Sequence, residues 1–164
     1  MSVTEQLIAE LRHEAATTRR VIERLPEEKL TWQPHPKSMK LGELAMHIAM
    51  LPHGIAELLS ETVREAPVVP RVQPQTVAEI VAKLGETIDH AAGKLTEWGD
   101  EGLKETWRLV SQGQTLVELP RGVAVRNLMM NHAYHHRGQL TVYLRLLDVP
   151  LPSVYGPTAD EVRF

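Results

Sequence analysis

Apolar residues return every three or four positions along four long segments of the chain, and this spacing constrains the fold more than any other feature. Such a period places the apolar side chains on one face of an α-helix, and that face must be buried against other helices. Pro26 directly follows the first segment, as is typical just beyond a helix end. Pro52 lies within the second segment, where it predicts a kink or a break into two shorter helices. The segments are residues 2–25, 39–60, 77–98 and 121–148.

Both ends of the third segment carry capping signals. Thr76 and Glu79 form the pattern T-x-x-E, in which side chains and backbone N–H groups satisfy one another at a helix start. Gly99 follows the last periodic residue, and glycine is the residue most often found just beyond a helix end. The third helix is therefore predicted to begin after Thr76 and to end at Gly99.

Two long connections separate the predicted helices. Residues 26–37 and 61–75 each contain three prolines and are long enough to allow a crossover topology. Residues 106–110 and 115–119 flank a short polar stretch and predict either a small hairpin or an irregular loop. With four amphipathic helices and almost no strand, we predict an all-α fold, a four-helix bundle with long crossover connections, in a single domain over residues 1–164.

The composition argues against several classes of function. The net charge is −3 and no basic block is larger than Arg19–Arg20, so we expect no nucleic-acid partner, because phosphates are bound by clustered Lys and Arg. No apolar run approaches the length of a membrane span, and the first residues do not form a signal peptide, so we expect no membrane partner. The absence of cysteine excludes disulfides and a cysteine nucleophile and fits a cytoplasmic protein.

Histidine is the anomaly in the composition, with eight copies against one phenylalanine. His132 and His136 are four residues apart on the apolar stripe of the last predicted helix, so both imidazoles point toward the core. Two histidines at this spacing can bind one metal ion. His47 lies on the apolar face of the second predicted helix and is the best candidate for a third ligand. His135 lies nearer the edge of its stripe and ranks behind these three as a ligand.

The same histidines also have a structural interpretation. A buried imidazole needs a hydrogen-bond partner, because an unpaired polar group in a core costs about 1–3 kcal/mol. Spacing alone does not decide between a metal site and hydrogen-bonded core residues for His132 and His136, and His47 favours the metal site only moderately. The other four histidines are interpreted as hydrogen-bonded core residues or surface residues: His13, His35, His53 and His90.

Three stretches of the sequence resemble a known family, the DinB/YfiT-like superfamily. Residues 131–161 are similar to the last helix and tail of that family and contain its H-x-x-x-H-R-G-Q pattern. Residues 41–50 resemble its second helix, in which one histidine lies among apolar residues, and residues 30–44 resemble the loop that leads into it. The similarity extends over nearly the whole chain.

The resemblance implies both a fold and a site. It implies a four-helix bundle with a crossover, often a homodimer, and a divalent metal ion held by three histidines that correspond to His47, His132 and His136. Members include S-transferases and isomerases that use bacillithiol, mycothiol or glutathione, as well as metal-dependent hydrolases. The ion is expected to be Zn²⁺, Ni²⁺ or Fe²⁺, since imidazole binds all of these.

The leading functional hypothesis is a metal-dependent enzyme that transfers a group onto or through a low-molecular-weight thiol, with a small-molecule substrate. Arg137, Gln139 and Tyr143 are candidate catalytic residues. Arg137 could pair with the carboxylate of a thiol cofactor, and Gln139 could fix the tautomer of a ligand histidine. The alternatives are a metal-dependent hydrolase, a non-catalytic dimeric metal-binding or stress-response protein, and a metal-free bundle with a histidine-bonded core.

Overall fold

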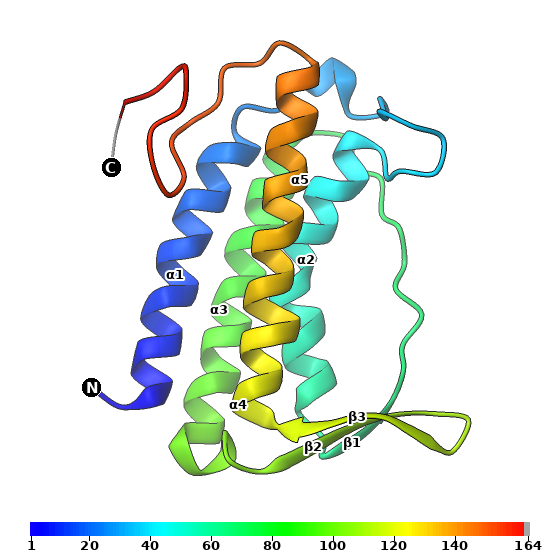
Figure 1. Ribbon diagram of the computed structural model, residues 1–164, viewed down its shortest axis with the longest axis vertical. Coiled ribbons are helices and arrows are strands. Elements are labelled where there is room, and N and C mark those ends of the chain that lie inside the picture. Colours follow the sequence, from blue (N-terminus) through cyan, green and yellow to red (C-terminus); the bar gives the residue numbers. More distant parts are fainter. Residues whose placement is uncertain (163–164) are drawn as a thin grey trace.

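All four predicted segments form helices in the computed structural model, which describes residues 1–162 (Figure 1). The last segment is one continuous rod made of a short α-helix, a π-helical stretch and a longer α-helix. A 3₁₀ helix, η1 (Glu27–Lys29), lies in the first long connection. The bounds are α1 (Val3–Ile22), α2 (Leu41–Leu59), α3 (Val77–Gly102), α4 (Arg121–Ala124), η2 (Val125–Asn131) and α5 (His132–Leu146).

The helices run up, down, down and up in the order of the chain (Figure 1). After α2, residues 66–76 run the full length of the bundle before α3 begins, so α2 and α3 point in the same direction. The last rod then returns along α1 and α2, and the C-terminal tail folds back beside the end of α1. The crossover topology that the long connections predicted is therefore confirmed.

The predicted break at Pro52 is absent, and α2 continues through this residue as one helix. Proline removes one backbone donor, which leaves a carbonyl group of the preceding turn without its usual partner. That carbonyl belongs to Ile48, and at the next residue the hydroxyl of Thr87 of α3 donates to the carbonyl of Ala49 at 2.5 Å. Packing of α2 against α3 thus adds a hydrogen bond beside the position that Pro52 weakens.

The Thr76 cap of the third helix is confirmed, whereas the reciprocal half of the capping box is not, because the Glu79 carboxylate accepts from the Gln75 backbone N–H at 2.9 Å. The Thr76 side chain accepts a hydrogen bond from the Glu79 backbone N–H at 3.2 Å. The predicted end at Gly99 is three residues early, since α3 extends to Gly102. Gly99 adopts φ 58°, a left-handed conformation that glycine reaches without strain, and it interrupts the regular helix before a last turn that ends at Gly102.

A small three-stranded sheet closes one end of the bundle, and it corrects the expectation of an all-α fold. β1 (Val63–Glu65) pairs in parallel with β2 (Thr106–Ser111), which pairs in antiparallel with β3 (Gln114–Pro120). The second and third strands are the predicted hairpin, and its turn residues Gln112 and Gly113 both have positive φ, as a tight two-residue hairpin turn requires. The fold is therefore mostly helical, with four helices and this sheet.

The sheet is held at this end because Trp107 of β2 and Arg121, the first residue of α4 directly after β3, cap two helices. The last carbonyl groups of a helix have no partner within the helix. The Trp107 indole N–H donates to the Leu58 carbonyl at 3.1 Å, and Arg121 donates to the Leu59 carbonyl at 2.9 Å. Arg121 also donates to the Gly102 carbonyl at 2.6 Å, so one guanidinium joins the ends of α2 and α3.

Replacing Trp107 with phenylalanine is expected to lower the free energy of unfolding by about 1–3 kcal/mol, because the buried Leu58 carbonyl loses its donor. Trp107 is fully buried, so water cannot take the place of the indole. Urea denaturation followed by circular dichroism measures the change. Trp32→Phe is the matched control, since the Trp32 side chain is only half-buried and has no hydrogen bond within residues 1–162. An equal loss in the two variants would contradict the capping role.

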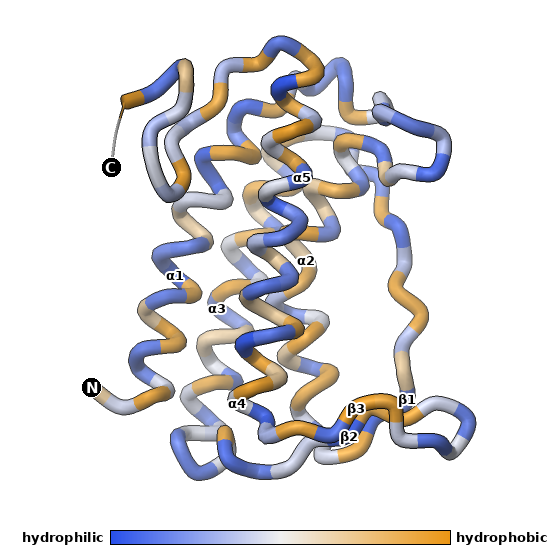
Figure 2. Tube along the Cα trace, viewed as in Figure 1, coloured by the Kyte–Doolittle hydropathy of each residue, from blue (hydrophilic) through white to orange (hydrophobic). Residues whose placement is uncertain are grey.

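The apolar faces of the helices pack into one cluster that runs through the bundle. Figure 2 shows hydrophobic and hydrophilic segments alternating along each helix, as the helical period requires. Within the described residues, no helix is both long enough and apolar enough to cross a membrane.

Candidate metal centre

Three histidines from two helices converge in the middle of the bundle. His47 comes from α2, and His132 and His136 come from successive turns at the start of α5. The ring centroid of His47 lies 5.5 Å from that of His132 and 4.7 Å from that of His136, and the last two are 4.6 Å apart. Each ring offers one nitrogen within 4.8 Å of the nitrogens of the other two. The helices thus bring together the three residues that the sequence indicated.

The environment keeps all three imidazoles neutral near pH 7. Burial, together with the neighbouring charges of His136 and His132, lowers the pKa of His47 to about 4. Burial also lowers the pKa of His132 and His136, although a hydrogen bond to each ring opposes the shift. Neutral imidazole is the form that binds a metal ion, because protonation removes the lone pair.

The hydrogen bonds of two rings leave their inner nitrogens free. His136 Nδ1 lies 2.7 Å from Gln139 Oε1, an acceptor, so Nδ1 carries the proton. His132 bonds to the backbone carbonyl of Leu128, also an acceptor, which places its proton on the nitrogen that faces this carbonyl. The two Nε2 atoms then face each other at 2.8 Å, each with a lone pair. Two such lone pairs repel unless both bind one cation, so the donor set fits a metal ion.

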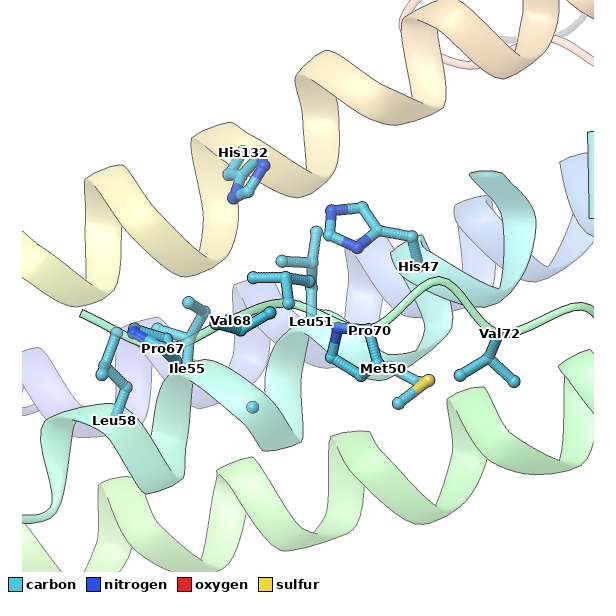
Figure 3. Close-up of a pocket in the computed structure, with 12 residues that line it drawn as sticks. His47, Met50, Leu51, Ile55, Leu58, Pro67, Val68, Pro70, Val72 and His132 are labelled. Carbon is cyan, nitrogen blue, oxygen red and sulfur yellow. The ribbon is translucent and has the colours of Figure 1, made fainter. Parts of the chain in front are cut away.

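A cavity opens beside the histidines. It has a volume of about 210 Å³, and His47 and His132 form part of its wall. Figure 3 shows the two rings, one from each helix, facing the space that Leu51, Val68 and Pro70 also border. The remaining wall is apolar and comes from α2 and from the crossover segment, residues 66–76. An ion held by the three histidines would therefore adjoin a space large enough for a small molecule.

The other residues singled out from the sequence lie at different places. Gln139 contacts His136, as expected for a residue that fixes the ring. Tyr143 lies two helical turns beyond His136 and packs edge-on against Trp32, with ring centroids 5.8 Å apart. His135 is exposed, and its ring centroid lies 5.1 Å from that of His136.

Arg137 does not belong to the histidine cluster. Its side chain is 2% exposed and turns toward α1, where it forms an ion pair with Glu14 at 2.7 Å. It also donates to Thr18 and to the hydroxyl of Tyr155 in the C-terminal tail. This position gives no support to the catalytic role that the sequence suggested, and it makes Arg137 a link between α1, α5 and the tail.

Sequence reasoning missed one local feature of the site. The turn before His132 is π-helical, in η2, whereas the periodicity predicted a regular α-helix through residues 121–148. π-helical turns are rare and occur often at functional sites. Leu128, whose carbonyl binds the His132 ring, lies within this stretch. Asn131, which ends η2, adjoins the first ligand directly, so the irregular turn determines how that ligand is presented.

Replacing Gln139 with alanine is expected to weaken metal binding by about 10–100-fold, because the His136 ring loses the partner that orients it. A Gln139→Glu variant keeps an acceptor at this position and should retain the affinity. Competition with a chromophoric chelator measures both values. Equal affinities of wild type and Gln139→Ala would show that this hydrogen bond does not support the site.

The fold is a crossover bundle of four helices, and two of these helices contribute three inward histidines beside an apolar cavity. These features define a class of helical proteins with a candidate metal centre. The chain belongs to the DinB family, whose sequence profile matches residues 1–163. It is 28% identical over 151 residues to the uncharacterized protein YrdA of Bacillus subtilis, covering 90% of this chain and 85% of that protein.

Solved structures of DinB-like proteins share the fold. One from Bacillus cereus superposes with a TM-score of 0.71 at 22% identity, over 94% of this chain and 98% of its own. Another, YjoA of Bacillus subtilis, superposes with a TM-score of 0.67 at 17% identity, over 97% of this chain and 99% of its own. The resemblance expected from the sequence motifs is thus confirmed.

Proposed function

We propose that this protein is a divalent-metal-dependent enzyme that transfers a group onto or through a low-molecular-weight thiol. His47, His132 and His136 would hold the ion. The observation that carries the proposal is the apolar cavity of about 210 Å³ that two of these histidines border. A structural metal site is usually closed by four protein ligands, whereas three ligands beside a cavity leave room for a substrate group.

The bound ion would lower the pKa of a thiol or a water molecule placed beside it. The chain itself supplies the positions of the reacting groups. Gln139 and the Leu128 carbonyl fix the two ligand rings of α5, and an apolar wall lines the space next to them. Met50, Ile55 and Val72 on this wall would take the apolar part of a substrate.

The nucleophile of the reaction would come from outside the protein. The chain has no cysteine, and the side chains that line the cavity within the described residues offer no nitrogen or oxygen atoms except those of His47 and His132. A thiol that enters with its cofactor meets no competing protein thiol at the ion. This supports thiol transfer over a mechanism with a covalent protein intermediate.

An assay with metal-loaded protein tests the proposal. An apolar electrophile such as a bimane halide is mixed with bacillithiol, mycothiol or glutathione, and conjugate formation is followed by fluorescence. We expect a rate above the uncatalysed reaction with one of these thiols, and no such excess with His136→Ala. If the protein instead hydrolyses aryl esters without added thiol, and His136→Ala does not, the protein is a hydrolase and the thiol-transfer proposal is wrong. Absence of both activities in protein with stoichiometric metal would leave a non-catalytic metal-binding protein.

A homodimer is part of the proposal, since the family resemblance implies one. Sedimentation velocity of the untagged protein at micromolar concentration is expected to give a single species with twice the mass of the 18.4 kDa chain. The apolar residues Val142 and Leu146 are more than half exposed on α5, and a Val142→Glu/Leu146→Glu variant examines whether this face takes part. A monomer in the wild type would contradict the dimer and leave the enzymatic proposal intact.

A further inference from the structure

A second cluster of metal-binding side chains lies on the outer face of the bundle, between α2 and α3. His53 and Glu57 are four residues apart on α2, and Glu86 and His90 are four residues apart on α3. On each helix this spacing places both side chains on one face. The sequence had suggested only surface or hydrogen-bonded roles for His53 and His90, since their spacing becomes informative only when the two helices are known to pack together.

Three of these side chains meet at one point. His90 Nε2 lies 2.7 Å from Glu57 Oε1. The rings of His53 and His90 are 4.1 Å apart between centroids, with their planes tilted by 36°. One donor atom from each of His53, Glu57 and His90 lies within 4.8 Å of the other two. The ion pair between His90 and Glu57 accounts for the positions of these two side chains. The His53 ring, by contrast, has no hydrogen bond or ion pair among residues 1–162.

We propose that His53, Glu57 and His90 form a second divalent-metal site, selective for Zn²⁺ and similar transition ions. Two imidazoles and one carboxylate are a donor set that suits Zn²⁺, Ni²⁺ and Cu²⁺, whereas Mg²⁺ and Ca²⁺ prefer oxygen ligands alone. The carboxylate neutralises part of the charge of the ion. The ligands come from two helices that pack along their length, so the folded chain holds them together before an ion arrives.

The second site is open to solvent, and this exposure lowers its affinity for an ion. His53 and Glu57 are exposed and His90 is half-buried, whereas all three histidines of the first site are at least partly buried. Glu86 does not complete the ligand set, because Lys83 donates to its carboxylate at 2.6 Å. Water would fill the remaining positions, and the ion would exchange with the solution more readily than an ion of the inner site.

The two sites are separate on α2. His53 lies six residues after His47, about 9 Å along the helix axis and on a different face. Met50 and Gly54 border both the inner cavity and a surface depression of about 240 Å³ that His53 and Glu86 line. A single helix wall therefore divides the two ligand sets, and neither shares a residue with the other.

Titration of untagged, chelator-treated protein with Zn²⁺ in the presence of a chromophoric indicator tests the inference. The wild type is expected to bind two ions, the second at least about tenfold more weakly than the first. His53→Ala/His90→Ala should bind only the tight ion, and His136→Ala should bind only the weak one. Alanine is a good helix former, so the exposed substitutions keep α2 and α3 folded, which circular dichroism verifies.

His13→Ala removes an exposed histidine of α1 that belongs to neither cluster, and it should keep both ions. A single ion in the wild type that His53→Ala/His90→Ala retains would overturn the second site, as would a weak ion that survives in this double variant. The His136→Ala variant separates this result from the proposed function. Whether the tight ion binds tests the ligand set of the proposed enzyme, and whether the weak ion binds tests the outer site.

Discussion

Replacing His136 with alanine is expected to remove the tightly bound divalent ion. The affinity for the ion should fall by more than about 100-fold, because loss of a residue that only orients a ligand already costs about 10–100-fold. His136 is the most buried of the three candidate ligands, at 9% exposed. Its ring contacts both other rings, and its Nε2 lies 2.8 Å from that of His132. Without it, two imidazoles from different helices remain, and the other side chains of the cavity wall supply no nitrogen or oxygen donor among the described residues.

Metal content of protein purified without an affinity tag gives the first measurement, and chelator competition gives the affinity. His135→Ala is the matched control, because it removes the adjacent exposed histidine from the same helix. It should keep the wild-type affinity. Stoichiometric tight metal in His136→Ala would show that these three residues are not the ligand set.

The same ion should stabilise the fold. A ligand that binds only the folded state raises the free energy of unfolding by about 2.7 kcal/mol when its concentration is 100 times its dissociation constant. Thermal denaturation of the wild type with and without excess ion therefore gives a higher midpoint with the ion. In His136→Ala the midpoint should not respond to concentrations that saturate only the inner site.

The helices of this protein were predictable from local sequence, and the sheet was not. Apolar residues at a spacing of three to four identify a helix within a single segment, and Thr76 marks the start of one directly. The sequence of the hairpin could equally be interpreted as an irregular loop, because its two strands are short. β1 has only three residues and pairs with the distant β2, as in the pairing of Val63 with Arg108. Nothing in so short a segment indicates a partner so far along the chain.

The inner site was predictable in its residues, and its surroundings were not. The spacing of His132 and His136 and the apolar neighbours of His47 indicated the three histidines before any contact was known. The cavity wall could not be predicted, because it depends on where residues 66–76 run. Arg137 was proposed as a catalytic residue because its guanidinium could pair with the carboxylate of a thiol cofactor. Consecutive residues of a helix point about 100° apart, and this rotation directs Arg137 toward α1.

Arg137 forms the centre of a buried polar network between α1, α5 and the tail. Its ion pair with Glu14 is enclosed, since the Glu14 side chain is only 13% exposed. The guanidinium donates to the Glu14 carbonyl and the Thr18 hydroxyl at 3.2 Å each. It also lies over the rings of Tyr134 and Tyr155, at 5.3 and 5.0 Å from their centroids. Every side of this cation is therefore occupied by protein groups.

Replacing Arg137 with methionine is expected to lower the free energy of unfolding by about 3–5 kcal/mol, because removing one partner of a buried ion pair leaves the other charge uncompensated. Urea denaturation measures the loss. Arg145→Met is the control on the same helix. Its ion pair with Asp160 is far more exposed than that of Arg137, at 46% and 26% for the two side chains, and surface pairs contribute at most about 1 kcal/mol.

A second substitution separates charge burial from packing in this network. Glu14→Gln in the Arg137→Met background removes the stranded carboxylate and should recover part of the lost stability, since a neutral amide is far less costly to bury than a charge. Metal affinity of the folded Arg137→Met protein should equal that of the wild type, because no contact joins Arg137 to the three histidines within residues 1–162. If Arg137→Met has the same free energy of unfolding as the wild type but loses activity, Arg137 has a catalytic role after all. The geometry argues against that outcome, because the guanidinium lies on the α1 side of the helix and the cavity lies on the α2 side.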